Sequence, residues 1–325
     1  MTFAQILGHE RQKEVLRRAL KQDRLAHAYL FSGPEGVGKR LMALALARAV
    51  FCLEGTGCGS CVACRKVDHM NHPDLHLVEP DGASIKIDQV RHLQKDLSLR
   101  PSEAKRKVCV IDEIDKIGIA AGNALLKTLE EPSGEALFIL LTPRPEAVLQ
   151  TIRSRCQPLA FARLARELMF ETLKRQLELD ETKAHILTAL SDGSFKKALG
   201  RDRELFLEKR IELLKSLTAL SPRSIIPLFD FAETLSGKES DRATQQEILE
   251  IFQAFYRDLL LFRHGRSEEE LINIDLMEKI RRVAGRESIP SLLTKIEALE
   301  NARRQIARNA NSQLVMETLL LRLAS

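Results

Sequence analysis

Residues 33–40 read Gly33-Pro34-Glu35-Gly36-Val37-Gly38-Lys39-Arg40, which matches a phosphate-binding loop at every position except the last. The glycines at positions 33, 36 and 38 let backbone N–H groups converge on phosphate oxygens, and Lys39 brings a positive charge to the terminal phosphates. The pattern requires Ser or Thr after the lysine, because that hydroxyl binds the Mg²⁺ that makes hydrolysis efficient. Arg40 has no lone pair to give a metal. The loop therefore predicts a nucleotide site that lacks a main part of the machinery for hydrolysis.

This loop lies between a predicted strand over 27–32 and a predicted helix over 41–51. Further buried strands are expected over 74–78, 107–112, 136–142 and 156–161. Helices are expected over 10–20, 87–97 and 123–130, the last of them ended by Pro132. Strands that alternate with helices predict an α/β fold with a parallel sheet covered on both faces.

Acidic residues follow the apolar strand over 108–111. Asp112 is placed to hold Mg²⁺ at the strand end, and the adjacent Glu113 is placed to polarise an attacking water. Thr142 ends the next strand, where its hydroxyl would contact the water or a γ-phosphate. These residues extend the predicted nucleotide site beyond the glycine loop.

Beyond about residue 162 the strand signals vanish and helical patterns continue to the C-terminus. They are interrupted at 192–193, 221–222, 236–237 and 285. The sequence therefore predicts an α/β domain over 1–162, a small helical domain over 163–204 and a larger helical domain over 205–325. The fold class is α/β plus all-α.

Four cysteines lie within thirteen positions, in the spacing Cys-x5-Cys-x2-Cys-x2-Cys: Cys52, Cys58, Cys61 and Cys64. Four thiolates this close suit a tetrahedral zinc ion, and the glycines at 55, 57 and 59 allow a tight loop. Cysteines at two-residue intervals also match iron–sulfur spacing, whereas disulfides are not expected in the cytosol. We predict a structural zinc site in an insertion over 52–64, with His69 and His72 as surface or packing residues.

The composition sets limits on function. The 325 residues are 44% hydrophobic and 29% charged, and the formal net charge is +5 with both signs interspersed. The chain has no Trp and two Tyr, so an aromatic platform for single-stranded nucleic acid is not expected. It contains no run of about 20 apolar residues that would cross a bilayer, and its N-terminus lacks a signal-peptide layout. We expect a cytoplasmic protein that does not contact a membrane.

Three further motifs narrow the prediction: the run Leu125-Leu-Lys-Thr-Leu-Glu-Glu-Pro132, the triplet Ser154-Arg155-Cys156, and the stretch Asn309-Ala-Asn311-Ser-Gln-Leu314. With these motifs the whole chain resembles the clamp-loader subunits of bacterial DNA polymerase III, which belong to the AAA+ class. The resemblance supports zinc in the cysteine cluster. It also implies that 163–204 is a lid domain and 205–325 a collar domain for oligomerisation.

The resemblance implies partners and site residues. Clamp-loader subunits (gamma/tau and delta among them) form a hetero-pentameric ring that loads the sliding clamp onto primed DNA. Arg155 would be an arginine finger that acts in trans on the ATP of a neighbouring subunit. Lys196 occupies the sensor-2 position, where an ATPase subunit usually has an arginine. A lysine supplies charge but no bidentate fork.

Two functions within this family stay open. One is a stator-type subunit that binds ATP or ADP weakly or without productive turnover, with Glu113 as a vestigial or weak base. The other is a gamma/tau-type motor ATPase. Arg40 and Lys196 favour the stator. A third class, a separate nucleic-acid-binding regulator, lacks a helix-turn-helix signature or a basic stripe to support it.

Overall fold

The computed structural model describes residues 2–131, 135–200, 202–221, 223–237 and 240–325. They divide into two compact units. Unit 1 comprises Met1–Leu168 together with Ser194–Lys196, and unit 2 comprises Met169–Gly193 and Lys197–Ser325. The division into three domains made from the sequence stays a prediction.

Unit 1 is built on a parallel sheet, for which the described residues give five strands in the order β2-β3-β4-β1-β5. The strands are β1 (Ala28–Ser32), β2 (Leu75–Val78), β3 (Lys107–Ile111), β4 (Ala136–Thr142) and β5 (Gln157–Ala160). Ala28 is paired with Phe138 of β4, and Ser32 is paired with Ala160 of β5. Pro158 can be accommodated in β5 because this strand lies at the edge of the sheet.

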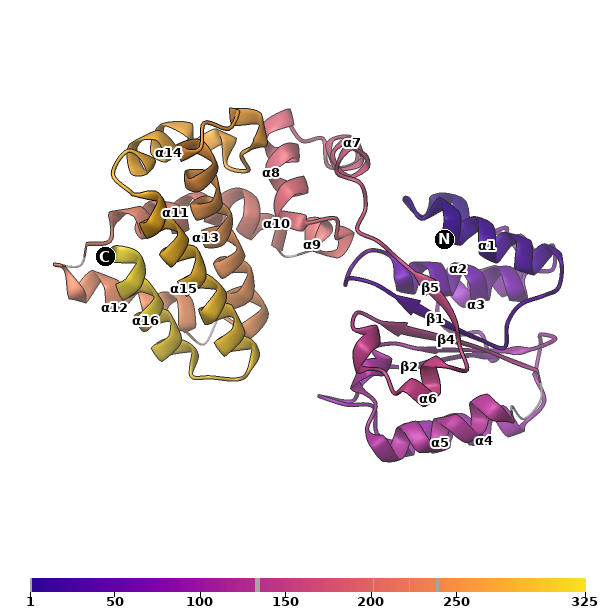
Figure 1. The fold of residues 1–325 in the computed structure, drawn as a ribbon. Helices are drawn as coiled ribbons and strands as arrows, with labels where there is room; N and C mark the ends of the chain where they lie inside the picture. Colours follow the sequence, from indigo (N-terminus) through magenta and orange to yellow (C-terminus); the bar gives the residue numbers. More distant parts are fainter. Residues whose placement is uncertain (1, 132–134, 201, 222, 238–239) are drawn as a thin grey trace. The chain divides into compact units, whose positions relative to one another are not determined.

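Helices cover both faces of this sheet (Figure 1). On one face lie α1 (Glu10–Lys21), α2 (Lys39–Phe51) and α3 (Val62–Asp68); on the other lie α4 (Ile87–Ser98), α5 (Ile119–Glu130) and α6 (Gln150–Arg153). Short 3₁₀ turns, η1 (Phe3–Gln5), η2 (Ile114–Lys116) and η3 (Pro145–Ala147), complete the unit.

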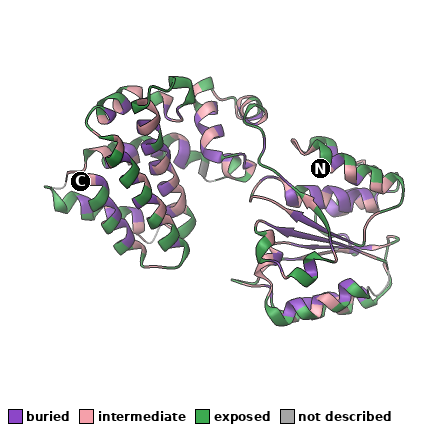
Figure 2. Ribbon diagram, in the orientation of Figure 1, coloured by how far each residue is buried: buried purple, intermediate pink, exposed green. Residues whose placement is uncertain are grey.

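The side chains of β1 show why the strands read as continuous apolar runs. Tyr29 and Phe31 pack into the core under α1 and α2, whereas Ala28 and Leu30 pack into the core under α4 and α5. Successive side chains of a strand point to opposite faces, so a sheet covered twice needs apolar residues at every position. The central strands are accordingly buried along their length (Figure 2).

Unit 2 is helical throughout its described residues. Two of its helices, α7 (Arg166–Leu177) and α9 (Phe195–Leu199), begin within unit 1. The other elements are α8 (Glu181–Ser191), α10 (Asp202–Glu204), the π-helical segment η4 (Leu205–Lys209), α11 (Arg210–Ala219), α12 (Ile225–Ser236), α13 (Arg242–Arg263), η5 (Glu268–Glu270), η6 (Ile274–Leu276), α14 (Met277–Ala284), α15 (Ile289–Ala307) and α16 (Ser312–Ala324). The long helix α13 packs against α14 and α15, and α16 packs against α12 and α15. The expected change from an α/β part to an all-helical part is confirmed.

The predicted interruptions fall at observed helix ends. Helix α8 ends before Asp192, which has a φ of 49°, and α14 ends before Gly285. Helix α12 ends at Ser236, before Gly237. Two prolines used in the sequence prediction, Pro132 and Pro222, lie outside the described residues.

A buried polar network holds unit 2 together. Asp258 of α13 is fully buried, and its carboxylate accepts hydrogen bonds from the backbone N–H of Ile272 (3.0 Å) and of Asn273 (2.8 Å). The Asn273 side-chain oxygen accepts in turn from the buried guanidinium of Arg210 (2.5 Å), which also pairs with Asp275 (2.5 Å). The network fixes the segment between α13 and α14 against α11.

Among the helices of the described residues, none combines the length and the apolar character that spanning a bilayer would require.

Candidate functional site

The phosphate-binding loop connects β1 to α2, as the sequence predicts. Gly33, Gly36 and Gly38 have φ angles of 144°, 73° and 105°, which favour glycine over other residues. Gly38 directly precedes Lys39, the first residue of α2. The loop therefore meets the amino end of a thirteen-residue helix, where free backbone N–H groups and the helix dipole attract anions.

Two of these glycines are also required by packing within unit 1. A Cβ atom on Gly33 would lie 2.1 Å from the carbonyl oxygen of Phe161, and one on Gly36 would lie 2.0 Å from Oγ of Ser194. The second contact shows that the segment Ser194–Lys196 lies directly against the loop. These glycines thus shape the fold as well as a phosphate cradle.

Lys39 lies almost buried in the loop. Its Nζ donates hydrogen bonds to the carbonyl oxygens of Gly33 (2.5 Å) and Pro34 (2.7 Å). Burial lowers the pKa of Lys39, and the nearby carboxylates of Asp112 and Glu35 oppose that shift. The ammonium group is therefore held by carbonyl groups of the loop itself, and its contact with terminal phosphates stays a prediction.

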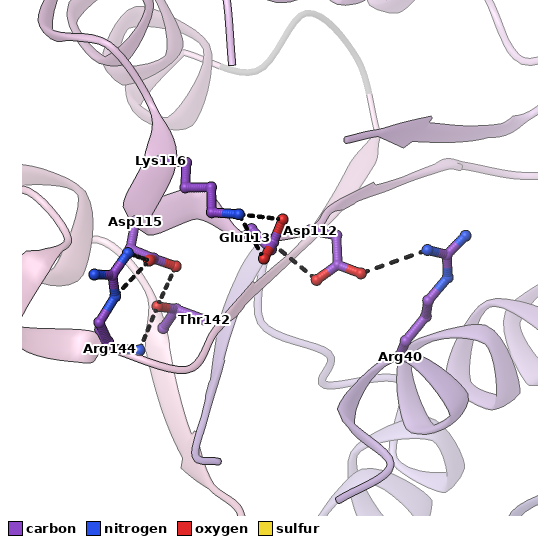
Figure 3. A network of polar contacts seen from close by, with 7 residues as sticks. All are labelled: Arg40, Asp112, Glu113, Asp115, Lys116, Thr142 and Arg144. Atoms are coloured by element: carbon purple, nitrogen blue, oxygen red, sulfur yellow. Dashed lines mark hydrogen bonds and ion pairs between the residues drawn. The ribbon is translucent and has the colours of Figure 1, made fainter. Parts of the chain in front are cut away.

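Arg40 extends toward the carboxyl end of β3 (Figure 3). Its Nη1 lies 3.6 Å from Oδ2 of Asp112, and the same nitrogen forms an ion pair with Glu79, which follows β2. Burial raises the pKa of Asp112, whereas the backbone N–H of Glu113 and the charge of Arg40 lower it. The structure therefore brings Arg40 to the carboxylate that was predicted to hold magnesium.

Glu113 and Thr142 are also engaged by neighbouring side chains (Figure 3). Glu113 has a φ of 49°, and its carboxylate accepts a hydrogen bond from Lys116 (2.9 Å). Thr142 donates its hydroxyl proton to Asp115 (2.8 Å), whose buried carboxylate also pairs with Arg144 (2.7 Å). The roles of Glu113 as a base and of Thr142 as a contact to water or phosphate stay predictions.

Lys196 comes to the same loop from a distant part of the sequence. It is exposed, and its backbone N–H points to the carbonyl oxygen of Gly36 at 3.5 Å. A Cβ atom on Gly36 would lie 2.8 Å from Cβ of Lys196. The structure thus places the predicted sensor residue beside the phosphate loop.

Arg155 lies at the other edge of the sheet. It lies two positions before β5, whereas the phosphate loop follows β1. These two strands are parallel neighbours, with Tyr29 opposite Gln157. A strand rises about 3.3 Å per residue, so the four residues of β5 alone separate the two edges by roughly 13 Å. Arg155 cannot therefore serve the loop of its own chain.

The side chain of Arg155 is partly exposed and locally held. It forms an ion pair with Glu130, the last residue of α5, and its Nη1 donates to the carbonyl oxygen of Thr151 (2.9 Å). The sequence motifs that carry Glu130 and Arg155 are thereby brought into contact.

The four clustered cysteines converge as predicted. Cys52 follows the last residue of α2, and Cys61 and Cys64 belong to the start of α3. The four Sγ atoms lie within 4.8 Å of one another, and those of Cys58 and Cys64 are 3.9 Å apart. Zinc–sulfur bonds of about 2.3 Å in a tetrahedron place sulfurs about 3.8 Å apart. The geometry fits a four-thiolate metal site.

Backbone donors point to two of the sulfurs, but the pKa shifts differ within the cluster, since burial raises the pKa of Cys64 to about 12. The N–H of Cys58 points to Sγ of Cys52 (3.4 Å), and the N–H of Cys64 points to Sγ of Cys61 (3.5 Å). Burial alone would raise the pKa of Cys52, but hydrogen bonds from the backbone lower it to about 6. A thiolate is the form that binds metal. The two nearby histidines lie outside the four-cysteine cluster of the described residues. His69 is exposed, and His72 is buried and stacks on Phe51.

Comparisons with known proteins show the family of the chain. A family model described as "DNA polymerase III, delta subunit" matches residues 8–165, and one described as "DNA polymerase III, delta subunit, C terminal" matches residues 204–325. The DNA polymerase III subunit delta' of Bacillus subtilis is 35% identical over 316 residues, covering 96% of this chain and 95% of that protein. The chain belongs to the DNA polymerase III delta' family. The family resemblance stated from the sequence is confirmed.

Two further similarities concern another DNA polymerase III subunit and the fold. The DNA polymerase III subunit tau of B. subtilis is 27% identical over 350 residues, covering 99% of this chain but 61% of that protein. A DNA polymerase III gamma subunit-related protein from Thermotoga maritima aligns with a TM-score of 0.50 at 20% identity, covering 96% of this chain and 98% of the other. The latter shows the fold alone, and with it the predicted α/β fold followed in the chain by helices is confirmed.

Three residues of these sites escaped the sequence analysis. Glu79 and Lys116 pair with Arg40 and Glu113, and no motif includes them. Arg48 of α2 is buried beside the cysteine loop, where its Nη2 donates to Asp68 (2.6 Å). An arginine within a helical pattern gives no sign of burial, because arginines usually lie on exposed faces.

Proposed function

We propose that this delta'-family chain is a subunit of a bacterial clamp loader and acts in DNA replication by helping to load the sliding clamp onto primed DNA. Its main chemical contribution is Arg155, delivered to the ATP of an adjacent ATPase subunit. The observation that carries this proposal is the position of Arg155 at the sheet edge opposite its own phosphate loop. An arginine finger stabilises charge that develops on the γ-phosphate, an effect of roughly 10³–10⁵ in rate.

The contacts of Arg155 suit a residue that changes partners. The side chain is 36% exposed and that of its partner Glu130 is 49% exposed. Exposed ion pairs contribute about 0–1 kcal/mol, so this pair is easily exchanged for a triphosphate. Arg155 is thus held in place without being committed to Glu130.

The chain's own nucleotide site contributes little or no turnover. Position 40 lacks the metal-binding hydroxyl, Glu113 is paired with Lys116, and Lys196 replaces an arginine. ATP or ADP binds weakly or is not hydrolysed, with Gly33, Gly36, Gly38 and Lys39 around the phosphates.

The partners in this proposal are the gamma/tau and delta subunits of a hetero-pentameric ring, together with the sliding clamp and primed DNA. Residues 163–204 act as the lid and residues 205–325 as the collar through which the ring forms. The four cysteines hold one structural Zn²⁺, since four protein ligands leave no open position for catalysis.

The test is the ATPase activity of a reconstituted ring that contains Arg155→Ala. The ring used keeps only the ATP site that faces Arg155 active. In this ring we expect the rate of ATP hydrolysis to fall by roughly 100-fold or more, while gel filtration shows intact rings. Arg153→Ala is the matched control, because Arg153 is an exposed arginine two positions away at the end of α6. Loss of assembly in Arg155→Ala, or unchanged hydrolysis in intact rings, contradicts the proposal.

A second candidate is a motor ATPase of the gamma/tau type. The retained residues Lys39, Asp112 and Glu113, together with the similarity to a tau subunit, favour it. Steady-state turnover by the isolated chain distinguishes the two functions. Turnover at the rate of a motor subunit supports the second candidate, and turnover at background supports the first.

A further inference from the structure

The position that follows the phosphate-loop lysine is occupied by a cation of the protein itself. Arg40 lies in the first turn of α2, and its guanidinium faces two carboxylates that follow neighbouring strands, Glu79 after β2 and Asp112 after β3. The phosphate loop follows β1 of the same parallel sheet. The two carboxylates and the phosphate loop therefore lie at the carboxyl edge of the sheet, where the phosphates of a nucleotide would bind.

These residues do not fit a magnesium ion. In phosphate-loop enzymes Mg²⁺ is held by the hydroxyl after the lysine and by an acidic residue at a strand end. Here the hydroxyl is replaced by a guanidinium, which has only donors, and this group lies 3.6 Å from Asp112. A divalent cation at that position would meet the positive charge of Arg40 at close range and find one carboxylate already neutralised.

We propose that Arg40 replaces the divalent cation, so that this site binds an adenosine di- or triphosphate without magnesium. The inference rests on the proposed function, in which the loop still takes nucleotide. Together with Lys39, the guanidinium offers two positive charges to the β- and γ-phosphate oxygens.

The exposure of Arg40 supports this role. Its side chain is 42% exposed and that of Glu79 is 47% exposed, so separating the pair requires little free energy. Rotation of the guanidinium away from Glu79 needs no change in the buried core.

The test is an equilibrium titration of the isolated full chain with mant-ADP and mant-ATP, in excess EDTA and in excess Mg²⁺. We expect the two dissociation constants for each nucleotide to agree within about threefold, a difference well under 1.4 kcal/mol. Binding that weakens by about tenfold or more in EDTA overturns the proposal. Absence of binding in both conditions overturns it as well.

Variants at position 40 compare the guanidinium with a metal-binding hydroxyl and with neither group. Arg40→Thr restores the metal-binding hydroxyl, and we expect its binding to require Mg²⁺, with affinity in EDTA at least about tenfold below that in magnesium. Arg40→Ala should bind weakly in both conditions. Arg91→Ala, which changes an exposed arginine of α4, is the matched control and should bind like the unchanged chain. Equal binding by Arg40→Ala and the unchanged chain in EDTA contradicts the proposal.

This experiment can fail without the proposed function failing. If nucleotide binding depends on magnesium but Arg155→Ala still lowers the ATPase rate of the ring, only the role proposed for Arg40 is refuted. If nucleotide binding is independent of magnesium but Arg155→Ala leaves the ATPase rate unchanged, the arginine finger is refuted and the role proposed for Arg40 stands.

Discussion

Arg155 is paired with Glu130, the residue at the end of α5. The two residues are twenty-five positions apart and belong to different sequence motifs, and the pair lies away from the phosphate loop of the same chain. Under the proposed function, a carboxylate in this position would compete with the neighbour's triphosphate for the guanidinium.

The Glu130 carboxylate gives the first prediction. Because the pair is exposed, Glu130→Gln should change the ATPase rate of the reconstituted ring by no more than about twofold, and in the direction of an increase. Glu131→Gln, at the exposed neighbouring position, is the control. A loss of activity as large as that of Arg155→Ala would mean that Glu130 positions the arginine instead of competing for it.

Metal analysis gives the second prediction. The purified chain should contain one zinc ion, and Cys58→Ser should lose it, because the sulfur of Cys58 lies 3.9 Å from that of Cys64. Since binding of a structural zinc ion is coupled to folding, its removal by a chelator should lower the melting temperature. Iron with acid-labile sulfide in place of zinc would contradict the prediction. In Cys156→Ala, a core cysteine outside the cluster, the zinc content should be unchanged.

The sheet could be predicted because its strands are buried on both faces. Residues 108–111 read as one apolar run, and all five positions of β3, including Lys107, are buried. Helix α3 could not be predicted, since its seven residues are too few to show a periodicity. The helix predicted over 123–130 begins at Ile119, which is 76% exposed and therefore breaks the apolar pattern.

In both candidate sites the sequence predicted the residues of the motif but not the residues that pair with them. The cysteine spacing and the phosphate loop are local in sequence, so their members could be named. The partners of these residues could not, because Glu79 is thirty-nine positions from Arg40 and lies in no regular pattern. Contacts of this kind depend on which strand ends become neighbours, and the strand order β2-β3-β4-β1-β5 supplies that information.

Asp74 gives a prediction for pH dependence. Its carboxylate is fully buried and accepts hydrogen bonds from the N–H groups of Ser102 (2.7 Å), Glu103 (2.8 Å) and Ala104 (2.8 Å). Burial alone would raise the pKa of Asp74, but these hydrogen bonds hold it below its usual value. Stability from such a group is present above the unfolded-state pKa of about 3.9 and is lost as the pH falls through the lower folded-state pKa.

The measurement is the free energy of urea unfolding of Asp74→Asn against pH. We expect a loss of about 2–3 kcal/mol at neutral pH, because a charged acceptor of three hydrogen bonds is replaced by a neutral one. The difference from the unchanged chain should shrink on acidification. Asp88→Asn, whose side chain is 85% exposed on α4, should behave like the unchanged chain. A difference that stays constant down to low pH would show that the charge of Asp74 is not responsible.

Arg210 tests the buried network of unit 2. Its guanidinium is nearly fully buried and donates to the carbonyl oxygen of Phe206 (2.9 Å), to Asn273 (2.5 Å) and to Asp275 (2.5 Å). Arg210→Met keeps much of the apolar bulk but leaves these acceptors without their donor, so we expect the free energy of unfolding to fall by about 3–5 kcal/mol. Arg281→Met removes an arginine whose ion pair with Glu268 is exposed, and its effect should stay below about 1 kcal/mol. Equal effects of the two substitutions would show that the buried hydrogen bonds of Arg210 contribute no more to stability than a surface ion pair.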